Sequence, residues 1–311
     1  MKLETLKDDE HIYSGWARSR LMNAKQFMSA KRWQEYSGIS AKNLFSQIPF
    51  NAQTMDIVFR YKDIHSLKTD KELFLDHTTA STWLLTAESF EQLLNTQIKR
   101  INVIEPRAFG GHRGWRFCQE CVVEEREQFG FSYWHASHHL FGAVCCSKHG
   151  SLLFKPKDLH RYDYSLPHQW VGEAEAMILQ HEWQKDWQPF IYQLSAALKS
   201  DPELPNQLRK EVFELFLIDR ELTHHADKAG FDEIFAEMYQ DLGEHFFKEM
   251  FWRYARQHKY ALNVLWVAVT DYSALSGTKS PIYWLATIFW LRHKLPSLNG
   301  VINDDWNLQV H

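Results

Sequence analysis

The four cysteines of the chain, with one histidine, place the strongest constraint on what it can fold into. The cysteines all lie between residues 118 and 146, and three of them form the pattern Cys118-x2-Cys121-x24-Cys146-x2-His149 with the histidine. Two residues between ligands allow a tight turn to direct both side chains at one ion, and two such turns supply a tetrahedral site. The pattern therefore predicts one structural Zn²⁺ bound by three thiolates and one imidazole.

Cys145 is the alternative to the third predicted ligand. It would leave three residues before His149, whereas Cys146 leaves two and so matches the first pair. We therefore prefer Cys146 as the ligand and expect Cys145 to pack as a small apolar side chain. The competing interpretation is a group of buried, metal-free cysteines, and it leaves the two matched spacings to chance.

A catalytic zinc needs an open coordination position and a nearby general base. The predicted ligands already fill the tetrahedron. The nearest carboxylates in sequence resemble an exposed charged turn, and the nearest imidazoles resemble ordinary surface or core histidines: Glu120, Glu124, Glu125, His135, His138 and His139. We therefore expect no catalytic residue and no enzymatic activity. A metal-dependent nuclease or hydrolase is kept as the alternative from another functional class.

Composition limits the remaining choices. The chain has 311 residues, of which 45% are hydrophobic and 15% aromatic, which is typical of a globular protein with two or three domains. A net charge of −4 argues against a general nucleic-acid coat, so any such contact must use local basic patches. Clustered cysteines, with no apolar leader and no apolar stretch of about 20 residues, indicate a protein of a reducing cytoplasm.

Apolar residues recur at helical spacing, so the predicted fold class is mainly α. We expect an N-terminal helical domain over residues 1–112, a zinc finger over 113–156 and a C-terminal helical domain over 157–311. Inside the finger, residues 131–134 and 139–144 are expected to be short β-like or mixed segments. The C-terminal helices are expected at residues 174–200, 206–226, 231–258 and 280–294.

The N-terminal domain has the pattern of a helix-turn-helix. Helices are expected at residues 12–23, 26–36 and 41–47, with a turn at Ser37-Gly-Ile-Ser40 before the third. A plain helical hairpin without DNA contact is an equal alternative. A further helix is expected at residues 81–96.

Two basic groups are the candidates for nucleic-acid contact. The first leads into the finger through a Gly-rich loop at residues 109–114, and the second lies on the N-terminal helices. Their members are Lys99, Arg100, Arg107, Arg113 and Arg116 in the first group, and Lys31, Arg32 and Lys42 in the second. The alternative is that Arg107 and Arg116 pair with the glutamates of the finger and only make it soluble.

Several segments together resemble the TniQ/TnsD family. The finger carries Arg116-Phe-Cys-Gln-Glu-Cys121, then Gly130-Phe-Ser-Tyr-Trp134, then His138-His-Leu-Phe-Gly-Ala-Val-Cys-Cys-Ser-Lys-His-Gly150. Gln119 and Phe141 stand where that family usually has proline, and neither is a predicted ligand. Weaker likeness extends to Glu10-His-Ile-Tyr-Ser-Gly-Trp-Ala-Arg18, to Asp76-His-Thr78 and to segments after residue 230.

The resemblance implies a non-catalytic role in the target selection of Tn7-like transposons. Such proteins recognise target DNA directly, or a CRISPR RNA-guided effector (Cascade), and recruit an AAA+ ATPase that brings in the transposase. The short C-terminal part and the acidic charge favour the TniQ-type adaptor, and a direct, TnsD-like DNA reader is the alternative. The expected partners are therefore the AAA+ regulator, Cascade or target DNA, and a second copy of the chain, without a membrane.

Overall fold

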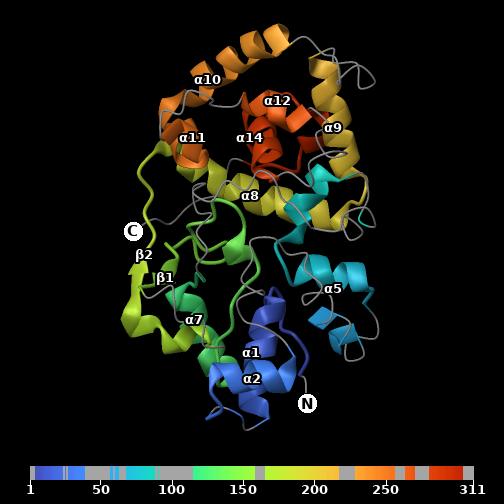
Figure 1. Cartoon of the computed structure of the whole chain (residues 1–311). Coiled ribbons are helices and arrows are strands. Elements are labelled where there is room, and N and C mark those ends of the chain that lie inside the picture. Colours follow the sequence, from blue (N-terminus) through green and yellow to red (C-terminus); the bar gives the residue numbers. More distant parts are fainter. Residues whose placement is uncertain are drawn as a thin grey trace. The chain divides into compact units, whose positions relative to one another are not determined.

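The computed structural model describes residues 4–23, 25, 27–38, 57–58, 60–62, 68–87, 90, 115–157, 165–216, 228–255, 263–269 and 280–303. Helices predominate in these residues, and the one sheet among them has two strands (Figure 1). The predicted fold class, mainly α, is confirmed. None of the described helices is long and apolar enough to cross a membrane.

Two compact units divide the described residues. Unit 1 contains those up to Ala80 together with those from Trp115 to Gln180, and unit 2 contains those from Ser81 to Phe90 and from His181 onward. The finger segment and the N-terminal helices therefore share one unit, whereas we expected separate domains. Whether the three predicted segments fold independently stays a prediction.

The N-terminal helices of unit 1 begin and end at recognisable caps. Helix α1 (Ile12–Met22) begins at His11, whose Nδ1 accepts a hydrogen bond from the backbone N–H of Tyr13. Helix α2 (Ala30–Ser37) begins at Ser29 and ends at Gly38, which has φ 73°. Helix α5 (Asp70–Asp76) begins with a capping box between Thr69 and Glu72. The predicted helix at residues 41–47 lies outside the described residues.

The finger segment contains one full helix, α7 (Gln119–Phe129), which ends at Gly130 with φ 78°. Strands β1 (Phe154–Pro156) and β2 (Ala174–Ala176) pair antiparallel, with Lys155 opposite Glu175. Short 3-10 helices lie within the segment, η2 (Ser137–His139), and after it, η3 (Pro167–Gln169) and η4 (Val171–Glu173). The expected β-like segments at 131–134 and 139–144 do not form strands, and only isolated bridges at His135 and Cys145 flank them.

The backbone of the finger pairs with the N-terminal segment, which explains that difference. His11 N–H donates to the Trp134 carbonyl at 2.7 Å, and Ala136 N–H donates to the Asp9 carbonyl at 2.7 Å. Trp134 N–H in turn donates to the Ser14 hydroxyl at 3.0 Å. Because residues more than 100 positions away satisfy these groups, the segment needs no neighbouring finger strand.

Unit 2 is a group of helices around α14 (Ile282–Leu291), which is apolar on all sides and almost completely buried (Figure 1). The core of this unit includes the rings of Trp187, Phe190 and Phe246 around Phe289, with centroid distances from Phe289 of 5.0, 5.1 and 6.0 Å. The other elements are η1 (Ala80–Thr86), α8 (Glu182–Ser200), α9 (Leu204–Leu215), α10 (Lys228–Met250), α11 (Trp252–Ala255), α12 (Val264–Val269) and η6 (Pro296–Leu298).

Besides the helix expected at 81–96, which is described only as the 3-10 helix η1 (Ala80–Thr86), two predicted C-terminal helices differ from the observed ones. The helix expected from residue 174 begins only at Glu182, because residues 174–176 form β2 and the Gln184 side chain caps the backbone at His181. The helix expected at 231–258 is interrupted at Gly243, which has φ 78° and ψ 158°. That conformation is outside the helical region and costs glycine little, so the chain bends there.

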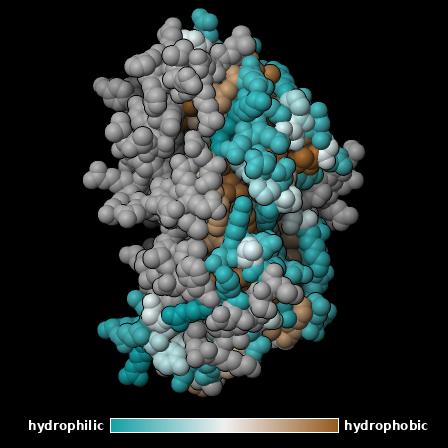
Figure 2. Space-filling model, turned by 90° about the vertical axis from the view of Figure 1, so that its right-hand side faces the viewer, coloured by the Kyte–Doolittle hydropathy of each residue, from teal (hydrophilic) through white to brown (hydrophobic). Residues whose placement is uncertain are grey.

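The surface agrees with the acidic, globular composition. On the face drawn in Figure 2, hydrophilic residues cover most of the described surface, and hydrophobic ones lie in small groups between them. Among the described residues, the large apolar side chain with the highest exposed fraction is Phe27, which is 93% exposed in the connection between α1 and α2. Tyr36 on α2 is about half exposed and lies near Lys25, whose Nζ is 5.5 Å from the ring centroid.

Candidate metal centre

The start of helix α7 positions the first pair of cysteines. Cys118 is the N-cap residue with extended backbone angles, and Cys121 lies in the first helical turn. Side chains at these two positions converge beside the free N–H groups of the helix start, where the helix dipole favours negative charge. The local sequence thus prepares a position for two thiolates, with a helix in place of the expected tight turn.

A short turn positions the second pair. Gly150 has φ 70°, and its N–H donates to the Cys146 carbonyl at 2.9 Å, which reverses the chain directly after His149. Cys146 N–H then donates to the Ser151 carbonyl at 2.8 Å. A residue other than glycine would be strained at this positive φ, so glycine is suited to the position.

The structure brings the four predicted ligands together. Their ligand atoms lie within 4.8 Å of one another. His149 Nδ1 is 3.4 Å from the Cys118 and Cys121 sulfurs and 3.6 Å from the Cys146 sulfur. The sulfurs of Cys121 and Cys146 are 3.7 Å apart.

These distances fit a tetrahedral ion. Zinc–sulfur bonds of about 2.3 Å and zinc–nitrogen bonds of about 2.0–2.1 Å, at tetrahedral angles, require S···N separations of about 3.5 Å and S···S separations of about 3.8 Å. The observed distances agree with both values to within about 0.2 Å. The four residues could therefore hold one metal ion without rearrangement.

The close approach of the sulfurs shifts the pKa values of Cys118 and Cys121 in opposite directions. Hydrogen bonds from the Cys121 and Cys146 side chains hold the pKa of Cys118 well below its usual range. The hydrogen bond to Cys118 correspondingly raises the pKa of Cys121. One thiolate thus accepts from its neighbours, and a bound divalent cation would favour deprotonation of the others.

Cys145 does not belong to this group. It is completely buried and forms an isolated β-bridge with Leu152. Burial raises the pKa of its thiol to about 12, so it is a poor thiolate and suits a packing role. The structure therefore places Cys146, and not its neighbour, beside the other three predicted ligands.

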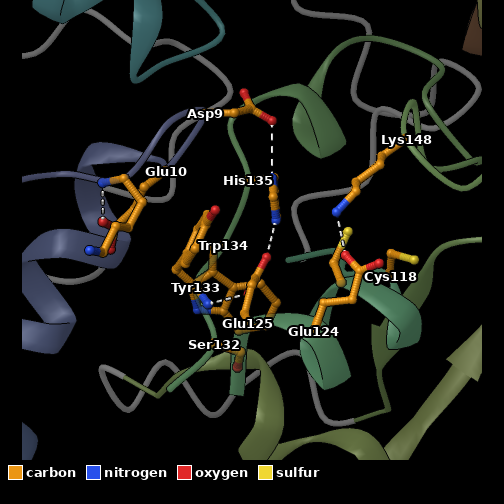
Figure 3. A network of polar contacts seen from close by, with 12 residues as sticks. Asp9, Glu10, Cys118, Glu124, Glu125, Ser132, Tyr133, Trp134, His135 and Lys148 are labelled. Atoms are coloured by element: carbon orange, nitrogen blue, oxygen red, sulfur yellow. Dashed lines mark hydrogen bonds and ion pairs between the residues drawn. The ribbon is translucent and has the colours of Figure 1, made fainter. Parts of the chain in front are cut away.

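A buried polar network lies next to the metal group, and the sequence analysis did not identify it. His135 stands between two carboxylates, with Nδ1 3.2 Å from Asp9 Oδ2 and Nε2 2.5 Å from Glu125 Oε1 (Figure 3). Burial disfavours charge on His135, but hydrogen bonds and charges from both carboxylates raise its pKa to about 10. His135 is therefore an imidazolium that joins the N-terminal segment to α7.

The carboxylates of the finger differ from their predicted role. Glu120, Glu124 and Glu125 lie on helix α7 and not in a turn. Glu125 is only 6% exposed, because its Oε2 accepts from the Tyr133 N–H at 2.9 Å while Oε1 contacts His135. The expectation of an exposed charge is therefore wrong for Glu125. A signal was present in the sequence, since Glu125 follows Cys121 by one helical turn and so faces the same side.

His138 and His139 lie in the interior. The sequence analysis expected ordinary surface or core histidines here, and both are core residues. Burial and the nearby charged His135 lower the pKa of His138 to about 3. Burial, with the charge of Arg116, lowers the pKa of His139 well below its usual value. Both rings are neutral in the folded protein and take no part in the metal group.

The predicted nucleic-acid contacts are divided. Lys31 and Arg32 are exposed on α2. Arg116 is only 3% exposed, because it donates to the Ala143 carbonyl at 2.6 Å and to the Leu140 carbonyl at 3.3 Å. Its guanidinium thus fixes the backbone of residues 140–143, just before the second pair of ligands. The prediction that Arg116 contacts nucleic acid is therefore wrong. The remaining predicted contacts lie outside the described residues: Lys42, Lys99, Arg100, Arg107 and Arg113.

The short motifs of the first 80 residues contact one another, and Glu10 forms an isolated bridge with His135 of the finger. Arg18 forms a buried ion pair with Glu10, 2.8 Å between Nη2 and Oε2. His77 Nδ1 is 2.8 Å from the Glu10 carbonyl oxygen, and Ile12 N–H donates to the His77 carbonyl at 2.8 Å. These residues belong to the short motifs in the first 80 residues, so the motifs and the finger form one packed structure.

The fold and site define a class: a mainly α protein in which a three-cysteine, one-histidine cluster packs against N-terminal helices. Within this class, residues 5–153 match the model of the TniQ family. Comparison with curated proteins returns no match. A TniQ domain implies a role in target selection during Tn7-like transposition, and TniQ proteins are non-catalytic transposition adaptors.

Proposed function

We propose that this chain is an adaptor that links a target-recognition complex to the AAA+ regulator of a Tn7-like transposon. The observation that carries the proposal is the TniQ match over residues 5–153, a region in which the metal group and the N-terminal helices form one unit. The favoured target-recognition complex is a CRISPR RNA-guided effector of the Cascade type. The net charge of −4 supports protein partners over extended DNA contact.

The metal in this proposal is a single structural Zn²⁺ held by Cys118, Cys121, Cys146 and His149. Zinc suits three thiolates and one imidazole in a tetrahedral arrangement, and a closed ligand set of this kind is typical of structural sites. When bound, the ion contributes folding free energy to the finger. The chain itself positions the ligands, because helix α7 orients Cys118 and Cys121 and the turn at Gly150 orients Cys146 and His149.

Complex formation tests the adaptor role. Purified chain, the AAA+ ATPase of the same transposon and ATP would be passed together through a size-exclusion column, with and without Cascade bound to its target. We expect the chain to co-elute with each partner and to bridge the two. An AAA+ regulator from an unrelated transposon is the control. Failure to bind either partner, in zinc-loaded and folded protein, would reject the proposal.

Direct DNA reading is the second candidate, and exposed Lys31 and Arg32 on α2 favour it. A protein that neutralises several phosphates loses affinity steeply as salt rises, whereas an adaptor held by protein contacts does not. We would compare DNA binding of Lys31→Ala/Arg32→Ala with that of Lys185→Ala/Lys210→Ala, which removes the same charge from exposed positions on α8 and α9. A flatter salt slope in the first variant alone would support DNA contact at α2.

A further inference from the structure

The predicted histidine ligand has a second partner. Nδ1 of His149 faces the three sulfurs, at 3.4, 3.4 and 3.6 Å. Its other ring nitrogen, Nε2, is 3.1 Å from Oε1 of Glu124 on helix α7. The ring is thus held between the metal group on one side and a carboxylate on the other.

The carboxylate itself is held in place from two directions. Helix α7 begins at Cys118 and carries Cys121 and Glu124 on successive positions three residues apart, so the two cysteines and the glutamate belong to one rigid element. The Lys148 ammonium contacts the second carboxylate oxygen, Oε2. With Oε2 engaged by the neighbouring residue of the ligand turn, Oε1 is directed at His149.

This arrangement matters because a histidine binds a metal through only one nitrogen. The ring must carry its proton on Nε2 for Nδ1 to present a lone pair, and an acceptor beside Nε2 selects that tautomer. A carboxylate acceptor also fixes the ring plane and makes the ligand nitrogen more basic.

We propose that Glu124 is a positioning residue of the metal centre, which holds His149 in the tautomer and orientation that bind Zn²⁺ through Nδ1. This inference rests on the metal centre proposed above. It concerns metal affinity and not the recognition of transposition partners. Glu124 is 48% exposed, so its replacement removes the hydrogen bond without opening a cavity in the core.

The test compares three variants of the full chain. Glu124→Ala removes the acceptor, and Glu124→Gln keeps an oxygen that can accept from Nε2–H. Glu127→Ala removes one negative charge from an exposed position on the same helix, three residues further along, and is the matched control. Zinc dissociation constants would be measured by competition with a chromophoric chelator, at one pH and ionic strength.

Loss of an outer hydrogen bond of this kind typically weakens metal binding by about 10- to 100-fold. Because Glu124 is half exposed, we expect a dissociation constant about tenfold higher for Glu124→Ala, a smaller change for Glu124→Gln and none for Glu127→Ala. Long-range ¹H–¹⁵N NMR of His149 should show an Nε2-protonated ring in the wild type, and a change of its nitrogen shifts in Glu124→Ala.

Two outcomes would overturn the inference in different ways. Equal zinc affinity and equal His149 shifts in Glu124→Ala and Glu127→Ala would remove the positioning role and leave the metal centre intact. Absence of zinc binding by the wild-type chain would reject the metal centre itself, and the role of Glu124 with it. A Co²⁺-loaded sample of each variant, with its thiolate charge-transfer bands, shows whether all three cysteines still bind.

Discussion

At the scale of single residues, Asp9 has an unusual backbone conformation that serves the docking of the finger. Its φ is 58°, in the left-handed region that aspartate tolerates better than most residues. Its carboxylate accepts from the Ser137 N–H at 3.0 Å and from the Ser137 hydroxyl at 2.5 Å, and it faces His135. The Asp9 carboxylate thus accepts from the first N–H group of the 3-10 helix η2 and balances part of the positive charge of the buried His135.

His138 provides a prediction about acid stability. Its pKa is lowered from 6.5 to about 3, so below pH 6.5 the unfolded chain takes up a proton that the folded protein refuses. The stability contribution is present above pH 6.5 and is lost as pH falls. One pKa unit corresponds to about 1.4 kcal/mol, so between pH 6.5 and 5 wild type should lose about 2 kcal/mol more than His138→Phe.

Urea unfolding at several pH values measures this difference. His293→Phe, which replaces an exposed histidine of unit 2, is the control and should retain the wild-type acid dependence. Metal ligands titrate equally in all three proteins, so the comparison cancels their effect. Parallel acid profiles for wild type and His138→Phe would show that His138 is not the group responsible.

Cys145 and Cys146 supply a second prediction at this scale. Elemental analysis should find one zinc per chain in wild type and in Cys145→Ser, because only Cys146 lies beside the other ligand atoms. Cys146→Ser should lose most of the metal and, with it, folding free energy. The ligand assignment would have to be reversed if Cys145→Ser lost zinc and Cys146→Ser kept it.

At the scale of elements, helix α1 is buried on nearly every side. Residues from Ile12 to Ser19 are all buried, and at Gly15 the side chains of Leu6 and Tyr61 approach so closely that a Cβ atom would collide with both. A helix in this position has polar as well as apolar residues facing the interior. Its polar residues must therefore find partners inside, and Arg18 does so with Glu10.

The Arg18–Glu10 pair leads to a prediction for α1. The two side chains are 4% and 0% exposed, and Arg18 Nη2 also donates to the Thr5 carbonyl at 2.9 Å. Arg18→Met keeps the apolar stem but leaves the Glu10 charge buried and unpaired, which should lower the unfolding free energy by about 3–5 kcal/mol. Arg32→Met, at an exposed position of α2, should change it by less than about 0.5 kcal/mol.

Chemical denaturation followed by tryptophan fluorescence would measure both variants. Trp16 and Trp33 are buried on the two helices, so their emission changes when unit 1 unfolds. Similar losses in Arg18→Met and Arg32→Met would mean that the buried ion pair contributes little to the docking of α1.

At the scale of the whole molecule, the metal group and the N-terminal helices belong to one unit, whereas the core around Phe289 belongs to the other. Helix α7 carries two ligands and Glu125, and Glu125 reaches the N-terminal segment through His135 and Asp9. Loss of the ion should therefore disturb α1 as well as the finger. Unit 2 has its own aromatic core and should be affected much less.

Hydrogen exchange with mass spectrometry tests this coupling. After removal of zinc with a strong chelator, peptides from α7 and α1 should exchange faster together, while those from α8 and α14 should keep their protection. Returning zinc should restore the original pattern. Faster exchange confined to residues 115–157 would show that the N-terminal helices are stable without the finger, and loss throughout α14 would show that the two units unfold together.

The sequence alone determined the features that depend on short spacings. The paired two-residue gaps located the metal group, and the spacing of apolar residues located α1, most of α2 and α14. Family likeness at the finger and at residues 10–18 is confirmed by the TniQ match. These signals are local, because ligand turns, helix periods and caps each involve residues only a few positions apart.

Only the tertiary structure decided which polar groups meet. The Asp9–His135 contact joins residues more than 120 positions apart, and no spacing rule connects them. Arg116 resembled a surface charge until the carbonyls of Ala143 and Leu140 proved to surround it. Glu124 and Glu125 are neighbours in sequence, yet helical geometry turns one toward His149 at the surface and the other into the core. Burial and partner choice arise from packing between distant segments, which a single sequence does not encode in any local pattern.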